Sequence, residues 1–92
     1  MHFLKGSTAL VTGASVGIGL ATAKLLSEAG VRVIGCARRL EILRAEISDL
    51  PGPTLALQLD VADAESVAGF MTQLPPEWQS IDILINLSLI HI

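Results

Sequence analysis

Apolar and polar positions along this chain alternate between two kinds of segment. Short apolar runs containing β-branched residues are typical of strands that are covered on both faces. Longer stretches follow them, in which apolar residues recur at helical spacing. The pattern predicts strands over Ser7–Thr12, Val31–Cys36, Thr54–Leu59 and Ile81–Ile85. Because single helices separate these strands, we expect crossover connections and an α/β fold with a parallel, doubly wound sheet.

The first predicted helix covers Gly17–Ala29 and stops at Gly30, since glycine commonly follows the last helical residue. Apolar residues recur in it at helical spacing, which predicts one buried stripe. The residues of this stripe are Ile18, Ala21, Leu25, Leu26 and Ala29.

Two further helices are predicted between the later strands. One covers Leu40–Leu50 and ends before the Pro-Gly-Pro breaker at residues 51–53. The other begins at Asp63, a plausible N-cap, and closes at the proline pair that starts at Pro75. The apolar stripes are Ile42, Leu43 and Ile47 in the first, and Val67, Phe70, Met71 and Leu74 in the second.

Composition supports this architecture and narrows the functions. The 92 residues are 51% hydrophobic and 16% charged, with a mean hydropathy of +0.62, which fits strands covered on both faces. The formal charge of −3 provides no basic field for nucleic acid. Cys36 is the only cysteine, so an internal disulfide and a cysteine-based zinc cluster are excluded.

Neither membrane nor metal binding is indicated. Residues 1–5 lack the apolar core of a signal peptide, and charges interrupt the apolar stretch over residues 20–36 too often for a membrane span. His2 and His91 form no ligand spacing, so no metal site is expected. We therefore expect a cytoplasmic protein without nucleic-acid or membrane partners.

The stretch over residues 12–19 reads Thr-Gly-Ala-Ser-Val-Gly-Ile-Gly and joins the first strand to the first helix. A glycine turn at such a junction lets the backbone approach a phosphate, with amide groups and the positive end of the helix dipole facing the anion. Dinucleotide binding is therefore the first hypothesis. The alternative is a turn shaped only for close packing of the helix on the strand.

The spelling Thr-Gly-x-x-x-Gly-x-Gly resembles the short-chain dehydrogenase/reductase family, and the resemblance extends from Lys5 to Asn86. It implies a Rossmann-like sheet, truncated here after about the fourth strand. It also implies that Gly13, Gly17 and Gly19 line a pyrophosphate turn, which Thr12 fixes by hydrogen bonding. The Ile18 amide and the Ser15 hydroxyl are then implied to lie near cofactor oxygens.

The segment after the second strand indicates the type of dinucleotide. An NAD-selective site usually has an acidic residue here, and none occurs between Val31 and Leu40. Arg38 is instead placed to receive a 2′-phosphate through paired, charge-assisted hydrogen bonds. Arg39 either stacks on adenine or adds a second contact. The pattern favours NADP(H) over NAD(H); the alternative is a solvated basic loop.

Two later motifs also resemble the family. Asp60 and Val61 directly follow the third predicted strand. The resemblance implies that the carboxylate accepts a hydrogen bond from adenine while the valine backbone approaches the ring. Asp60 as a helix cap is the alternative. Asn86 matches the first residue of the family's Asn-Asn-Ala-Gly, and the resemblance implies that it contacts the ribose side of the cofactor. Leu87 follows it, so the rest of the motif is broken.

The family's chemistry uses a serine and a Tyr-x-x-x-Lys pair downstream of the fourth strand, and this chain contains no tyrosine. We therefore assign no catalytic residue and expect this chain alone to be inactive. The resemblance implies that the full-length protein interconverts a small-molecule carbonyl and an alcohol by hydride transfer, with homo-oligomers possible only in that form. The alternatives are a non-catalytic dinucleotide-binding regulatory module and a fragment without function.

The sequence divides into two parts. Residues 1–86 are interpreted as the N-terminal part of a single dinucleotide-binding domain. Residues 87–92 read Leu-Ser-Leu-Ile-His-Ile, which resembles the translation of a transposase end sequence used as a sequencing adapter. One hypothesis is a read that ran into adapter. The other is a true variant whose fourth strand continues into an apolar terminus.

Overall fold

The computed structural model describes residues 6–14, 17–59, 69–70 and 72–86, and in it the strands form one sheet. The strands are β1 (Thr8–Thr12), β2 (Arg32–Ala37), β3 (Thr54–Gln58) and β4 (Ile83–Asn86). Their order is β3-β2-β1-β4, and every neighbouring pair is parallel. The predicted Rossmann-like α/β fold is confirmed. The chain runs outward from β1 to β3 and then returns to the other side of β1, where the strand order reverses.

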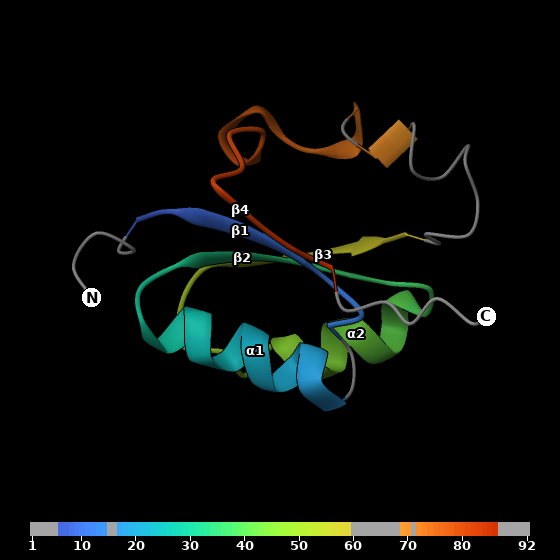
Figure 1. Ribbon diagram of the computed structural model, residues 1–92. Helices are drawn as coiled ribbons and strands as arrows, with labels where there is room; N and C mark the ends of the chain where they lie inside the picture. The colour runs from blue at the N-terminus through green and yellow to red at the C-terminus, as the bar shows by residue number, and fades with distance from the viewer. Residues whose placement is uncertain (1–5, 15–16, 60–68, 71, 87–92) are drawn as a thin grey trace.

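The two faces of the sheet are covered by different segments (Figure 1). Helices α1 (Gly17–Glu28) and α2 (Leu40–Ile47) lie against one face, while the segment that contains the short 3-10 helix η2 (Pro76–Trp78) crosses the other. Parallel strands need this double cover because both of their faces are apolar. The sheet is thus the middle of three layers.

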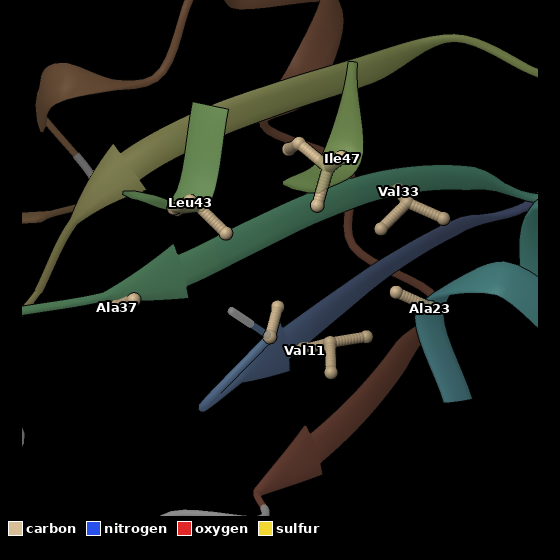
Figure 2. Close-up of a cluster of buried hydrophobic side chains, with 7 residues drawn as sticks. Val11, Ala23, Val33, Ala37, Leu43 and Ile47 are labelled. Atoms are coloured by element: carbon tan, nitrogen blue, oxygen red, sulfur yellow. The ribbon is translucent and has the colours of Figure 1, made fainter. Parts of the chain in front are cut away.

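The face under the helices holds one apolar cluster, in which side chains from the sheet point toward α1 and α2 (Figure 2). Val11 of β1 and the even-spaced Val33 and Ala37 of β2 contribute to it, in line with the two-residue period of a strand. Small and branched side chains meet there without polar atoms. The labelled members are Val11, Ala23, Val33, Ala37, Leu43 and Ile47.

The opposite face is closed by the chain around η2. Trp78 is buried there, in a cluster with Leu10 and Ile34 of the sheet. The Arg32 guanidinium carbon lies 4.2 Å from the centroid of the Trp78 ring, and Arg32 Nη1 donates a hydrogen bond of 2.9 Å to the Glu77 carbonyl. Arg32 therefore holds η2 against the sheet by a cation–π contact and a hydrogen bond.

Asp82 fastens the start of β4 to β1. Its carboxylate Oδ2 accepts a 2.9 Å hydrogen bond from the Thr8 amide, and its own amide donates one of 2.9 Å to the Thr8 carbonyl. The ladder then continues with Ala9 opposite Ile83 and Thr12 opposite Asn86. The strand predicted over Ile81–Ile85 therefore begins later, at Ile83. Asp82, just before it, makes the first contact with β1 through its side chain as well as its backbone.

The apolar stripe predicted for the first helix is wrong in four of its five positions, because Ala21 and Ala29 are exposed as well as the larger Ile18 and Leu25. Ile18 is 75% exposed and Leu25 is 69% exposed, whereas Gly19, Ala23 and Ser27 are buried. At Gly19 no side chain fits between the helix and the end of β1, and the larger Leu20 and Leu26 pack against the cluster only partly buried. Periodicity of hydrophobicity finds large apolar residues, so it missed this face.

The ends of the helices follow ordinary stop signals. After α1, Gly30 has φ 89°, and the amides of Gly30 and Val31 donate to the carbonyls of Ser27 and Leu26 at 3.1 and 3.0 Å, the Schellman pattern. The second helix ends at Ile47 rather than at the expected Leu50. The next residue is Ser48, whose hydroxyl donates a 3.0 Å hydrogen bond to the Ala45 carbonyl. Serine is common at helix ends because its side chain can bond to the backbone in this way.

The third predicted helix falls largely outside the described residues, including its expected cap Asp63 and Val67 and Met71. Two of its apolar positions are described: Leu74 is buried in the cluster under Trp78, and Phe70 packs against it. Residues 87–92 also lie outside the described part, so both hypotheses for them stay open. Among the described residues, no helix is long and apolar enough to cross a bilayer.

A pair of matched substitutions tests which side of each helix faces the sheet. Leu43→Ala empties a fully buried position and should lower the free energy of unfolding by about 2–5 kcal/mol. Leu25→Ala removes the same atoms from an exposed position and should change it by about 0.5 kcal/mol or less. Urea denaturation measures both. Equal losses would contradict this placement of the helices.

Candidate functional site

The carboxyl ends of the strands meet at one edge of the sheet. Thr12 at the end of β1 is level with Cys36 of β2 and Asn86 of β4, and Ala37 is level with Gln58 of β3. Every residue predicted to bind the cofactor either ends one of these strands or follows it in the sequence. In open α/β sheets, ligands bind outside the carboxyl ends where the strand order reverses, which here is between β1 and β4.

The turn after β1 depends on glycine. Gly13 has φ 68° and Gly17 has φ 58°, in the left-handed region that residues with a Cβ rarely adopt. At Gly19, a Cβ would lie 1.8 Å from the carbonyl oxygen of Gly13. The first turn of α1 therefore rests directly on the end of β1. Gly19 thus permits the close packing of helix on strand that was the alternative interpretation of the glycines.

The amino terminus of α1 is open to solvent at this edge. Ile18 in its first turn is exposed, and no acidic side chain lies in that turn. The first N–H groups of a helix have no partner within it, and they carry the positive end of its dipole. An anion can therefore approach them without meeting a negative side chain of α1. Ser15 lies outside the described residues, so its predicted contact stays a prediction.

Thr12 links the end of β1 to β4. Its side chain is buried, and Oγ1 donates a hydrogen bond of 3.5 Å to the Ile85 carbonyl. The main chain of Asn86 lies beside Thr12 in the parallel ladder. The strand ends where the order reverses are thus joined by a side chain as well as by the backbone. The family resemblance implies that Thr12 fixes the glycine turn by hydrogen bonding, and that role stays a prediction.

The basic segment after β2 is held by β3. The Leu59 amide donates to the Ala37 carbonyl at 2.9 Å, and Gln58 Nε2 donates to the Arg38 carbonyl at 3.0 Å. The side chains of Arg38 and Arg39 are exposed. Arg39 occupies the N-cap position of α2 without a side-chain cap. Both guanidinium groups are therefore available at the edge that carries the glycine turn.

Gln58 is a site residue that sequence reasoning missed. The available signal was a polar residue at the end of an otherwise apolar strand, Thr-Leu-Ala-Leu-Gln. Its partner could not be read from that signal, because the bond crosses from β3 to the segment after β2. Asp60 and Val61, the residues selected nearby, lie outside the described residues, and their adenine contacts stay predictions.

Cys36 lies beneath this edge and is chemically quiet. It is buried among apolar residues, and burial raises the pKa of its thiol to about 12. Its carbonyl accepts a 3.2 Å hydrogen bond from the Ala14 amide, which joins the glycine turn to β2. The backbone of this residue shapes the site, while the thiol fills space.

Two other features of the described residues bear on the chemistry of this chain. A groove of about 240 Å³ lies between α1 and α2, away from the glycine turn, and none of the predicted cofactor residues lines it. Its walls are Leu20, Lys24, Glu46, Asp49, Leu50 and Pro51. Within the part of the chain that the structure describes, no three His, Cys, Asp or Glu residues gather as a metal site would require.

Comparison with known proteins shows the family of the chain. The family described as short chain dehydrogenase matches residues 7–88. A probable NADP-dependent dehydrogenase of Dichelobacter nodosus is 46% identical over 77 residues, which cover 84% of this chain and 73% of that protein. An NADP-dependent 3-hydroxy acid dehydrogenase of Schizosaccharomyces pombe is 43% identical over 91 residues, covering 94% of this chain and 35% of that protein.

Solved structures give the same result. A metagenomic short-chain oxidoreductase in complex with NADP superposes with a TM-score of 0.80 at 36% identity, covering 88% of this chain and 38% of that one. The Pseudomonas aeruginosa RhlG/NADP complex gives a TM-score of 0.83 at 36% identity, covering 90% and 34%. The chain thus spans about a third of the length of these two proteins.

Gly19→Ala tests the close approach at the start of α1. The new methyl group would overlap the Gly13 carbonyl, so the helix must shift, and we expect a loss of about 1–3 kcal/mol or more in the free energy of unfolding. Gly69→Ala is the control, because nothing lies within 4 Å of a Cβ there. In that helical position alanine should be neutral or stabilising. Equal stability of the two variants in urea would refute the close approach.

The Cys36 thiol gives the unfolding free energy a dependence on alkaline pH. Burial raises its pKa from 9.0 to about 12, so the folded protein keeps the proton where the unfolded chain loses it. Stability should therefore fall as pH rises from 9 towards 12, and less steeply in Cys36→Ala. Urea denaturation across this range measures the two slopes. Parallel slopes would show that the thiol is not buried as described.

Proposed function

The chain belongs to the short-chain dehydrogenase/reductase family of oxidoreductases, and from this premise we propose that it forms the NADP(H)-binding portion of an enzyme that interconverts a carbonyl and an alcohol. The observation that carries the proposal is the position of Arg38. It is exposed at the same sheet edge as the glycine turn, in a segment without acidic residues. Relatives named as NADP-dependent support the same cofactor.

The glycine turn fits a pyrophosphate. The left-handed residues Gly13 and Gly17 carry no side chain that would keep a phosphate from the backbone. The amino terminus of α1 supplies N–H groups that have no partner within the helix and the positive end of the helix dipole, with no acidic residue in the first turn. In this proposal the amides around Ile18 bind the pyrophosphate, and the Ser15 hydroxyl adds a polar contact.

The segment after β2 fits a 2′-phosphate. A guanidinium presents paired N–H donors to a phosphate, and Arg38 has no acidic neighbour in the segment to neutralise it. An acidic side chain at this place would instead bind the ribose hydroxyls and repel the phosphate. Arg39 supports the same selectivity by a stacking or charge contact. Asp60, Val61 and Asn86 are proposed to contact the adenine and ribose sides.

The bound nicotinamide would supply or accept the hydride. This chain binds and orients the cofactor, but it has no tyrosine for the proton transfer that the family carries out with a Ser/Tyr/Lys site. It spans 33% of a probable NADP-dependent dehydrogenase of Haemophilus influenzae and 35% of the S. pombe enzyme. We therefore assign catalysis, the small-molecule substrate and homo-oligomer formation to a full-length, cytoplasmic protein, and cofactor binding to this chain.

Substitution of Arg38 tests the selectivity. Arg38→Ala should weaken NADPH binding about tenfold to a hundredfold, because charge-assisted hydrogen bonds to the 2′-phosphate are lost, and should leave NADH binding nearly unchanged. Arg44→Ala removes the same charge from the exposed face of α2 and is the matched control. Isothermal titration calorimetry gives both dissociation constants. The proposal fails when the unaltered protein binds NADPH no more tightly than NADH.

A further inference from the structure

We propose that Gln58 is a positioning residue for cofactor selectivity, which holds the main chain of Arg38 so that its guanidinium meets a 2′-phosphate. The inference rests on the proposed NADP(H) binding and extends it to a residue outside the glycine turn and the basic pair. Gln58 has no charge and carries no known motif, so its role follows only from what it contacts.

The contact is a side-chain hydrogen bond between neighbouring strands. Gln58 Nε2 donates to the Arg38 carbonyl at 3.0 Å, and the two residues are 20 positions apart in sequence. One residue earlier, the Ala37 carbonyl accepts the Leu59 amide at 2.9 Å. The last carbonyl of β2 and the carbonyl after it are therefore both bound by residues at the end of β3 and just after it. The regular ladder ends at the pair Ala37 and Gln58, and the side chain extends it by one residue.

The far side of the segment is also fixed. Arg39 is the N-cap residue of α2, and its carbonyl accepts the Leu43 amide at 3.1 Å. The backbone of Arg38 is therefore held on both sides. Its own carbonyl is hydrogen-bonded to Gln58, and the next residue is the N-cap of α2. Its backbone direction is determined before any ligand arrives, although its side chain is exposed. An exposed side chain needs such support, because nothing packed around it sets its direction.

Preorganisation of this kind improves affinity by lowering the cost of ordering a mobile segment. It affects only ligands that use the ordered group. Gln58 should therefore matter for a dinucleotide with a 2′-phosphate and be nearly silent for one without it. A purely structural role would change both affinities together, or only the free energy of unfolding.

The test removes the donor while keeping the size of the side chain. Gln58→Met should weaken NADPH binding about threefold to tenfold, in line with the loss of one hydrogen bond, and leave NADH binding within error. Gln58→Ala is a second donor-free variant. Gln79→Met is the matched control, because Gln79 Nε2 makes the same kind of bond, 3.1 Å to the Leu74 carbonyl, in the segment after η2.

A double substitution shows whether Gln58 acts through Arg38. In an Arg38→Ala background, Gln58→Met should have no further effect on the NADPH dissociation constant measured by calorimetry. An undiminished effect in that background, or an unchanged NADPH to NADH ratio in both single variants, overturns the inference and leaves the proposed function intact. A protein without NADPH preference before any substitution overturns both.

Discussion

The contact between the first turn of α1 and the carbonyl of Gly13 determines how the rest of the molecule is placed. No side chain fits at Gly19, so the helix begins on top of the strand that precedes it. Small residues continue this approach along the helix at Ala23 and Ser27. At the far end of α1, Ser27 Oγ accepts a 2.9 Å hydrogen bond from the Gly52 amide. This bond attaches the turn after α2 to α1. One close helix–strand approach therefore organises the layer and directs the helix amino terminus to the edge where strands end.

Much of this architecture follows from the sequence, because alternating strands and helices permit few topologies. The strands and the first two helices were predicted within a few residues. The face of α1 was not, since a row of glycine, alanine and serine carries no hydrophobic signal. The start of β4 was also missed: Asp82 looks like an ordinary strand residue until its carboxylate is seen on the Thr8 amide.

The candidate site divides in the same way. The spacing of the glycines in the turn after β1 predicts their place in the site. The basic pair Arg38 and Arg39 is likewise predicted from its position after a strand. Gln58 gives almost no local signal, because its importance depends on the register between β2 and β3, which places it beside Arg38. Residues whose function comes from a partner distant in the chain are the ones that pattern analysis overlooks. Ser15, Asp60 and Val61 remain predictions from resemblance alone.

The central claim is that a phosphorylated dinucleotide binds at the carboxyl edge of the sheet. Amide chemical shifts of the 15N-labelled protein, followed during titration with NADPH, test it directly. The account predicts saturable changes confined to the amides after β1, at the start of α1 and around Arg38, with the Arg32 and Trp78 region on the other side of the molecule unaffected. Shifts that never saturate, or that gather around Trp78 or in the groove between α1 and α2, would contradict it.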